Sequence, residues 1–281
     1  MPSIAELLAA AAKRLESVSD SPRLDAEVLL AHAGGWNRTI LFAWPERQVD
    51  ATAAARFGLL LDRRCQGEPV AYLTGTREFW SRDFQVNPGV LIPRPETELL
   101  VEQALDTVAG MTQPRILDLG TGSGIVAITL AAELPKAQVT AVDVSRDALA
   151  VARGNAERHG IRNLRLLSSD WFSSLPNGER FDLIVSNPPY IAASDPHLNE
   201  GDVRFEPSLA LTSGNDGLNA IRLIIQSSRN FLISGGWLLF EHGWDQGQKA
   251  LELLLEAGYF SASTISDLLG NGRVSKGCWN G

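Results

Sequence analysis

Apolar residues follow a helical spacing through the first part of the chain. The first predicted helix carries them at intervals of three or four residues, at Ile4, Leu7, Leu8, Ala11 and Leu15. Ser21-Pro22 provides an N-cap and a first-turn proline for a second helix, which runs toward His32 and ends at Gly34-Gly35. A third helix fits Ala51 to Cys65. The pattern therefore predicts a small helical domain over residues 1–75.

Three aromatic residues of this region, Trp36, Phe42 and Trp44, are expected to fill the helical core. The alternative is an exposed aromatic face, which would suit the docking of a partner.

The periodicity changes after residue 75. Residues 77–81 and 83–86 alternate as strands do, and Asn87-Pro88-Gly89 turns the chain, so a β-hairpin linker is predicted over residues 76–93. Pro93-Arg94-Pro95-Glu96-Thr97 then opens a helix that continues through Ala104.

From residue 114 onward the pattern alternates between strand and helix. The predicted strands are Arg115–Leu119, Gln138–Asp143, Leu164–Ser168, Phe181–Ser186, Gly235–Glu241, Tyr259–Ile265 and Arg273–Trp279. The predicted helices are Ile125–Glu133, Arg146–His159, Leu218–Ile233 and Gln246–Ala257. Such alternation indicates an α/β fold with a mostly parallel sheet, and the last two strands, with no helix between them, predict an antiparallel edge hairpin. This domain is assigned residues 94–281.

Composition narrows the class of protein. The 281 residues are 44% hydrophobic and 21% charged, and no apolar run reaches the roughly 18 residues of a membrane span. The N-terminus has no signal-peptide pattern, and two cysteines are too few for a disulfide framework, so we expect a cytoplasmic protein. The net charge of −8 argues against direct nucleic-acid binding and favours a protein or small-molecule partner.

A glycine-rich loop, Asp118-Leu119-Gly120-Thr121-Gly122-Ser123-Gly124, joins the first strand of this domain to its helix. Glycines allow a ligand to approach the backbone closely, and Asp143 ends the next strand, where a carboxylate reaches a ribose diol. Residues 122–127 also satisfy the degenerate dinucleotide pattern, so a nicotinamide oxidoreductase is one candidate. S-adenosylmethionine is the other, and the acid at Asp118 favours it, because an anion repels a diphosphate but suits amino and sulfonium charges.

Two further groups follow neighbouring strands. Asp170-Trp171 is placed to bracket an adenine, although Trp171 also fits as a core aromatic. Asn187-Pro188-Pro189-Tyr190 follows the strand Phe181–Ser186, and its prolines make a rigid extended turn. An amide side chain in such a turn can hold an –NH2 group while the ring covers a flat substrate. The simpler interpretation is a proline-rich connecting loop.

The order of these motifs resembles class I S-adenosylmethionine-dependent methyltransferases. The helical front domain, the hairpin, Arg94-Pro95-Glu96-Thr97-Glu98 and Glu241-His242-Gly243 further resemble the PrmC/HemK release-factor glutamine methyltransferases. The resemblance implies methyl transfer to the N5 amide nitrogen of the glutamine in the Gly-Gly-Gln loop of class-1 peptide chain release factors. It implies cofactor contact at Gly120–Gly124, Asp143, Trp171 and Asn187, and substrate contact at Asn187, Pro188, Pro189 and Tyr190.

The expected mechanism has Asn187 and the Pro188 carbonyl accept the two N–H groups of the substrate amide, with Tyr190 stacked on it. His159 and His242 are expected to be structural. Alternatives with the same fold are an N6-adenine methyltransferase and a methyltransferase for a ribosomal-protein glutamine. A non-catalytic binding module is a further alternative.

Overall fold

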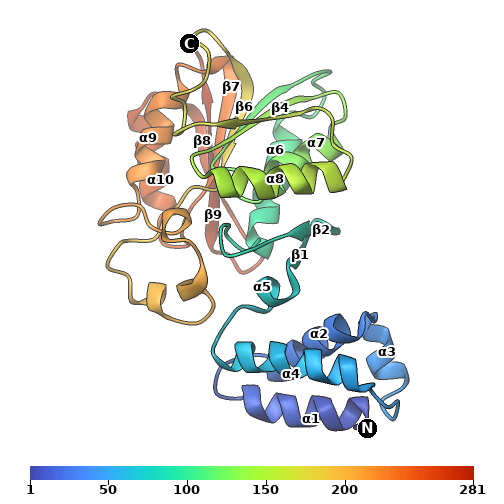
Figure 1. Ribbon diagram of the computed structural model, residues 1–281. Coiled ribbons are helices and arrows are strands. Elements are labelled where there is room, and N and C mark those ends of the chain that lie inside the picture. Colours follow the sequence, from blue (N-terminus) through green and yellow to red (C-terminus); the bar gives the residue numbers. More distant parts are fainter. The chain divides into compact units, whose positions relative to one another are not determined.

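The computed structural model describes residues 1–281 (Figure 1). Mostly apolar runs form the central strands of the sheet that follows residue 114. Four strands match the predicted residues: β3 (Arg115–Leu119), β4 (Gln138–Asp143), β5 (Leu164–Ser168) and β6 (Phe181–Ser186). The remaining three are β7 (Leu232–Glu241), β8 (Phe260–Ser266) and β9 (Gly272–Trp279). They form one seven-stranded sheet in the order β5-β4-β3-β6-β7-β9-β8.

The sheet is parallel except for β9, which is antiparallel to both β7 and β8. The predicted mostly parallel sheet with a C-terminal antiparallel hairpin is therefore confirmed. Strand β3 pairs with β4 on one side and β6 on the other, so the strand order reverses there. Open α/β sheets bind ligands at the carboxyl ends of strands beside such a reversal.

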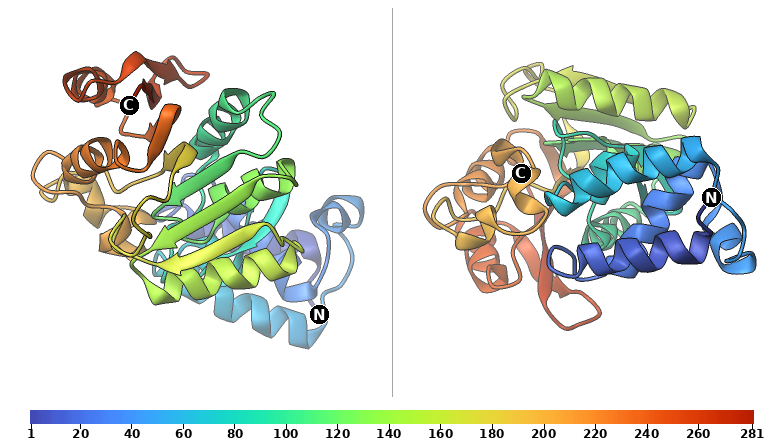
Figure 2. Two further views of the ribbon diagram at one scale, coloured as in Figure 1. Left: turned by 90° about the horizontal axis from the view of Figure 1, so that it is seen from above. Right: turned by 60° about the horizontal axis from the view of Figure 1, so that its bottom comes forward.

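Helices cover both faces of the sheet, as Figures 1 and 2 show. One face packs against α6 (Glu98–Thr107), α7 (Ile125–Glu133) and α8 (Arg146–Arg158), and the other against α9 (Asn219–Ser228) and α10 (Gly247–Glu256). Neighbouring residues of β3 illustrate the division, since Ile116 belongs to the first core and Leu117 to the second. Burial on both faces explains why the central strands read as mostly apolar runs.

The prediction of one helix over Leu218–Ile233 is wrong at its end. Helix α9 stops at Ser228, and Leu232 already begins β7, where it pairs with Phe181. The Phe181 amide donates to the Phe231 carbonyl at 2.8 Å. These apolar residues continue the helical spacing in sequence, but sheet pairing satisfies their backbone instead.

A short hairpin precedes the sheet, as predicted, with strands β1 (Thr76–Phe79) and β2 (Arg82–Gln85). Trp80 and Ser81 both have positive φ, 53° and 57°, as a two-residue type I′ turn requires. Buried Asn155 of α8 exchanges hydrogen bonds with the Gln85 backbone at 2.7 and 3.0 Å and donates to the Ser123 carbonyl at 2.9 Å. Asn155 thereby ties the hairpin to the glycine loop.

The helical unit contains α1 (Ile4–Leu15), α2 (Pro22–Gly34), α3 (Arg38–Ala43), α4 (Ala51–Cys65) and α5 (Val70–Thr74). Figure 2 shows its helices packed side by side. Their buried apolar residues form a core of their own. The apolar spacing does not predict the short helices α3 and α5. Helix α2 begins at Pro22 with Ser21 at the N-cap position, as predicted, although the Ser21 side chain makes no capping hydrogen bond. Ser3 and Glu6 form a capping box on α1.

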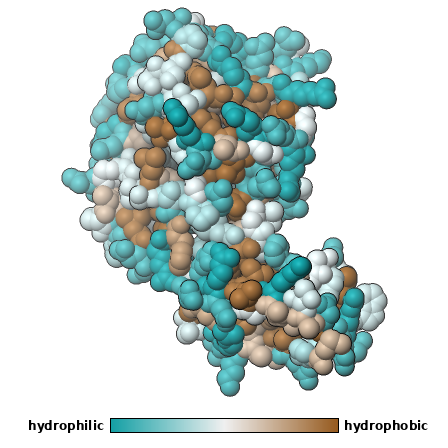
Figure 3. All heavy atoms as spheres, viewed as in Figure 1, coloured by the Kyte–Doolittle hydropathy of each residue, from teal (hydrophilic) through white to brown (hydrophobic).

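The expectation that all three aromatics fill this core is wrong for two of them. Trp36 packs against the core, but Phe42 is 62% exposed and Trp44 is 53% exposed. Helix α3 is only six residues long and buries Leu41, so Phe42 projects from its other side. Figure 3 shows apolar surface interrupting the hydrophilic covering of the molecule.

The two compact units are not continuous in sequence. The helical unit comprises residues 1–76 and 196–205, and the larger unit comprises residues 77–195 and 206–281. The inserted segment carries the short 3-10 helices η2 (Pro196–Asn199) and η3 (Val203–Phe205). Buried Arg64 of α4 pairs with Asp25 and with Asp202 of this segment, both at 2.8 Å. The predicted range 94–281 therefore includes ten residues that group with the helices. No helix in the protein is both long and apolar enough to span a bilayer.

Candidate active site

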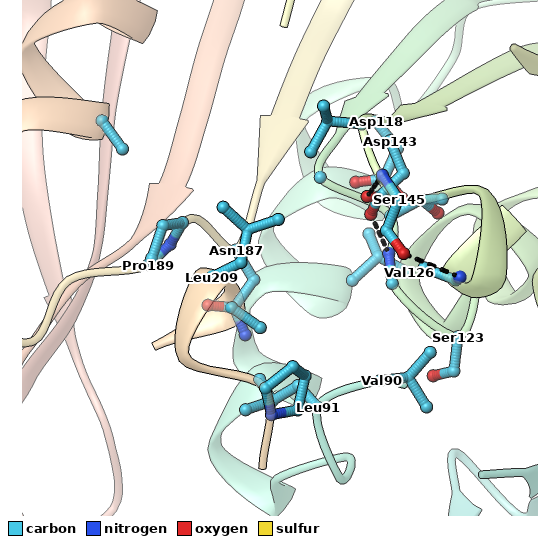
Figure 4. Close-up of a pocket in the computed structure, with 18 of the residues that line it drawn as sticks. Val90, Leu91, Asp118, Ser123, Val126, Asp143, Ser145, Asn187, Pro189 and Leu209 are labelled. Atoms are coloured by element: carbon cyan, nitrogen blue, oxygen red, sulfur yellow. Dashed lines mark hydrogen bonds between the residues drawn. The ribbon is translucent and has the colours of Figure 1, made fainter. Parts of the chain in front are cut away.

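A cavity of about 560 Å³ opens at the carboxyl edge of the sheet, entirely within the larger unit. Its walls come from the loop after β2, the glycine loop, the ends of β4, β5 and β6, and residues 207–213 (Figure 4). The predicted site residues that line it are Asp118, Gly120, Thr121, Gly122, Ser123, Asp143, Asp170, Trp171, Asn187 and Pro189. Three predicted residues, Gly124, Pro188 and Tyr190, do not line it.

The glycine loop approaches the cavity in a conformation that other residues rarely adopt. Gly120, Gly122 and Gly124 have φ of 71°, 56° and 86°. A Cβ at Gly122 would meet no atom within 4 Å, so this backbone is open to a ligand. A Cβ at Gly124 would instead lie 2.7 Å from Ile128 Cδ1, so Gly124 allows close packing behind the loop.

Asp143, at the end of β4, anchors the loop from the neighbouring strand. Its Oδ2 accepts a hydrogen bond from the Gly122 amide at 2.9 Å, and its Oδ1 accepts one from the Ser145 amide at 2.8 Å. Burial raises the pKa of this carboxyl above its usual value, and the backbone donors oppose that effect. The carboxylate oxygens retain lone pairs that ribose hydroxyls can use.

Asp118, in β3, is the most unusual acid of the site. It is 1% exposed, and its Oδ2 is buried with no hydrogen-bond partner. Burial is the main cause that raises the pKa of Asp118 to about 7, and the nearby Asp143 carboxylate adds to it. A buried oxygen without a donor, on the wall of an open cavity, fits a positively charged ligand group.

Trp171 adopts a positive φ of 50°, which is costly for a bulky residue. The Ser169 hydroxyl donates to the Trp171 carbonyl at 2.8 Å and helps to hold this conformation. The indole lines the cavity and also packs against the sheet core, so both interpretations of this residue apply in part. Exposed Asp170 lies beside it on the cavity wall.

Asn187 lies across the cavity from Asp118 and Asp143, in the labelled view of Figure 4. Its Nδ2 donates to the hydroxyl of buried Thr97 at 3.0 Å. Tyr190 turns away and donates from its hydroxyl to Glu241 Oε1 at 3.2 Å. Thr97 and Glu241 had no predicted role, although both belong to motifs that the resemblance rests on.

The linker arginine has a structural partner. Arg94 forms a tight ion pair with buried Glu206, whose Oε2 also accepts a hydrogen bond from the Ile92 amide at 3.1 Å. These contacts attach the start of the 207–213 wall to the linker. Sequence alone offered no signal for Glu206, because its partner lies far away in the chain.

Both histidines have structural partners, as predicted. His159 Nε2 contacts the Asp83 carbonyl at 3.0 Å, and its ring packs against Phe84. His242 is buried, with Nδ1 2.9 Å from the Gly243 carbonyl and Nε2 2.9 Å from Ser275 Oγ. Neither lines the cavity.

Solved structures share this architecture. A methyltransferase from Pyrococcus furiosus aligns over 78% of this chain and 97% of its own, with TM-score 0.53 and 18% identity. The 16S rRNA N2 G1207 methyltransferase of T. thermophilus, solved with AdoMet and guanosine, aligns over 73% of this chain and 50% of its own, with TM-score 0.55 and 19% identity. At these identities the likeness establishes the fold. The seven-stranded sheet of the larger unit thus has the class I methyltransferase fold.

Sequence comparisons then identify the family. Residues 6–75 match the PrmC N-terminal domain, and residues 95–202 match the methyltransferase small domain. The release factor glutamine methyltransferase of Salmonella typhimurium is 52% identical over 92% of this chain and 93% of its own length. That of Escherichia coli is 50% identical over the same shares, and that of Vibrio cholerae is 49% identical over 97% and 95%. The chain belongs to the release factor glutamine methyltransferase family.

Proposed function

We propose that this protein transfers a methyl group from S-adenosylmethionine to the side-chain amide nitrogen of the glutamine in the Gly-Gly-Gln motif of class-1 release factors. The observation that carries this proposal is the orientation of Asn187. Its NH2 group is bound to Thr97, which leaves Oδ1 as the free acceptor for an –NH2 group in the cavity. The substrate named for the relatives supplies such a group.

The cavity residues fit the cofactor group by group. Asp143 would accept from the ribose hydroxyls, and Asp118 would face the positive charges of the methionine portion. Asp170 and Trp171 would hold the adenine by a hydrogen bond and by stacking. When bound, S-adenosylmethionine supplies an activated methyl group, so the protein has to position the acceptor rather than activate it chemically.

The acceptor nitrogen is a poor nucleophile because its lone pair is delocalised into the carbonyl. The Asn187 Oδ1 would accept one of its N–H groups, which fixes the nitrogen and concentrates its electron density. Acceptance of the second N–H by the Pro188 carbonyl stays a prediction, since Pro188 does not line the cavity. Holding the reacting atoms about 3–3.5 Å apart and in line contributes several kcal/mol to a barrier reduction. Stacking of Tyr190 on the amide stays a prediction, since its ring does not line the cavity.

The helical unit is the part we propose for partner docking. Exposed Phe42 and Trp44 give it an aromatic surface that its own fold does not need. The net charge of −8 supports a protein partner over nucleic acid, and a cytoplasmic location agrees with a release-factor substrate.

The test is methyl transfer from labelled S-adenosylmethionine to purified release factor, with ribosomal proteins and DNA as separate acceptors. We expect label on the release factor, located by mass spectrometry at the Gly-Gly-Gln glutamine. A release factor with that glutamine changed to asparagine should accept none, because its nitrogen falls one methylene short. Label confined to DNA or to a ribosomal protein would refute the proposed substrate.

Asn187→Ala tests the site. We expect its kcat to fall by about 100-fold or more while the Kd for the cofactor changes by only about threefold. Asn177→Ala, at an exposed turn position, is the matched control and should retain wild-type turnover. Normal turnover by Asn187→Ala would exclude this residue from the reaction.

A further inference from the structure

A set of polar groups lies around Asn187 and has no place in the proposed reaction. Thr97 and Glu241 are both buried; Thr97 lies directly before α6, and Glu241 ends β7. Asn187 Nδ2 donates to Thr97 Oγ1 at 3.0 Å. The Thr97 hydroxyl lies close enough to the Glu241 carboxyl to lower its pKa, and Glu241 Oε2 is buried with no hydrogen-bond partner. The Tyr190 hydroxyl donates to the same carboxyl. Asn187 is therefore connected to a buried acid through one hydroxyl.

The hydroxyl of Thr97 has only one hydrogen, which decides the direction of this chain. An ionised carboxylate only accepts, so Thr97 has to donate to Glu241 and can only accept from Asn187. A reversed Asn187 amide would place its oxygen against Thr97, where two acceptors would compete for one hydrogen. Glu241 Oε2 is buried with no hydrogen-bond partner, so it is the acceptor that remains open to the Thr97 hydrogen.

We propose that Thr97 and Glu241 are positioning residues that lock the Asn187 amide with its oxygen toward the acceptor nitrogen. The inference rests on the proposed function, in which that oxygen accepts an N–H of the substrate. An NH2 group in the same place would meet the substrate NH2 donor to donor, and the acceptor would lose its orientation. The two residues thus set specificity for an amide without touching it.

The arrangement depends on the charge of Glu241. Burial raises the pKa of this carboxyl to about 7, while Thr97, Tyr190 and Arg273 of β9 lower it and Glu96 raises it. Burial raises the pKa of Tyr190, against the smaller effect of the Arg273 and Arg94 charges, which lower it. Once protonated, the carboxyl can donate to Thr97, whose hydrogen then becomes available to the Asn187 oxygen. We expect kcat at saturating cofactor to fall on the acid side of about pH 7.

The matched variants are Thr97→Val, which removes the hydroxyl at similar volume, and Thr97→Ser, which keeps it. We expect Thr97→Val to lower kcat by about 10- to 100-fold, with the cofactor Kd within about threefold of wild type. Thr97→Ser should restore kcat to within about threefold of wild type. If Thr97→Val keeps wild-type kcat while Thr97→Ser is slow, the methyl group and its packing matter rather than the hydroxyl, and the proposal is wrong.

Two readouts separate positioning from a merely structural role. Glu241→Gln does not titrate, so its kcat should lose the acid-side decline that wild type shows. Thr97→Val frees the Asn187 NH2 to face the cavity, so its preference for glutamine over glutamate at the release-factor position should fall by about tenfold in Kd. The proposal is wrong if Thr97→Val keeps the wild-type preference for glutamine and Glu241→Gln keeps the wild-type pH profile of kcat. The Glu241→Gln measurement does not require Thr97→Val to fold stably.

A parallel assay of the wild-type protein distinguishes failure of the proposed function from failure of the proposed positioning role. Absence of transfer to release factor in wild type counts against the proposed function. Transfer by wild type and equal transfer by Thr97→Val counts against the positioning role alone.

Discussion

Replacement of Asp118 by asparagine tests the electrostatic basis of cofactor binding. The substitution keeps the shape of a buried side chain whose Oδ2 has no hydrogen-bond partner, and it removes the charge. The wild-type carboxyl holds its proton in the folded protein up to about pH 7, whereas an exposed aspartate releases it near 3.8. Asp118→Asn therefore changes both the stability of the protein and the proton balance of cofactor binding.

The size of the effect on the free energy of unfolding follows from the folded and unfolded pKa values of Asp118. A pKa raised from 3.8 to about 7 corresponds to about 4 kcal/mol of cost when the folded protein carries the ionised group. Because the folded state binds the proton more tightly than the unfolded chain, this acid lowers the free energy of unfolding as pH rises from about 4 to 7. Asp118→Asn should thus be more stable than wild type at pH 8 by up to about 4 kcal/mol, and the difference should vanish near pH 4.

Cofactor binding should favour the ionised form of Asp118, whereas folding favours its protonated form. A cation beside Asp118 favours the ionised carboxylate, so binding at pH 6 should release about 0.9 proton from this group and at pH 8 only about 0.1. Isothermal titration calorimetry in buffers of different ionisation enthalpy measures that number. Asp118→Asn should bind S-adenosylmethionine about 10- to 100-fold more weakly at pH 8 and release correspondingly fewer protons at pH 6.

Glu241→Gln is the matched control, because Glu241 also has a pKa raised to about 7 but does not line the cavity. This variant should keep the full proton release on cofactor binding. Equal proton release by wild type and Asp118→Asn would refute the assignment of Asp118 to the positive charges of the ligand.

Three further predictions concern the loop, the indole and the helical surface. Gly124→Ala should lower the free energy of unfolding by about 2–4 kcal/mol, because its Cβ would lie 2.7 Å from Ile128 Cδ1. Gly178→Ala is the control: it has a similar φ of 85° but open space around it, so it should cost about 1 kcal/mol. Urea unfolding measures both. Trp171→Ala should weaken cofactor binding by about tenfold in calorimetry, while Trp171→Phe, which keeps a stacking ring, should lose about threefold, and equal losses would argue against stacking. Phe42→Ala and Trp44→Ala should each change the free energy of unfolding by less than about 0.5 kcal/mol, because both side chains are exposed. Phe57→Ala, at a buried position, should cost about 3–5 kcal/mol. A large loss at Phe42 or Trp44 would show that this residue packs in the core.

The sheet and its ligand-binding edge could be predicted because their signals are local. The central strands β3, β4 and β6 are mostly apolar runs, and polar groups at the carboxyl ends of parallel strands meet at one edge of the sheet. That rule, applied to the sequence alone, is enough to place Asp118, Asp143, Asp170 and Asn187 around one cavity. The same rule applies to Glu241, which ends β7, but nothing in its sequence context points to a ligand group for it.

The roles and elements that the sequence did not predict depend on contacts between distant segments. Thr97 acquires its role only where it meets the end of β6 and buried Glu241, and Glu206 only where it meets Arg94. Leu232 and Ile233 extend a helical pattern, and pairing with β6 makes them strand residues instead. Phe42 is apolar, as core residues are, but the six-residue helix α3 buries only the side that carries Leu41.

The ion pair between Arg64 and Asp202 has a consequence for synthesis of the protein. Its partners are 138 positions apart, so the helical unit lacks one of its own segments long after its last helix has been made. At about 5–20 residues per second, the ribosome adds the missing segment on the order of ten seconds later. During that interval the buried guanidinium of Arg64 has only Asp25 as a carboxylate partner. The helical unit thus reaches its final stability late in translation, after strands β3 to β6 of the sheet have been synthesised.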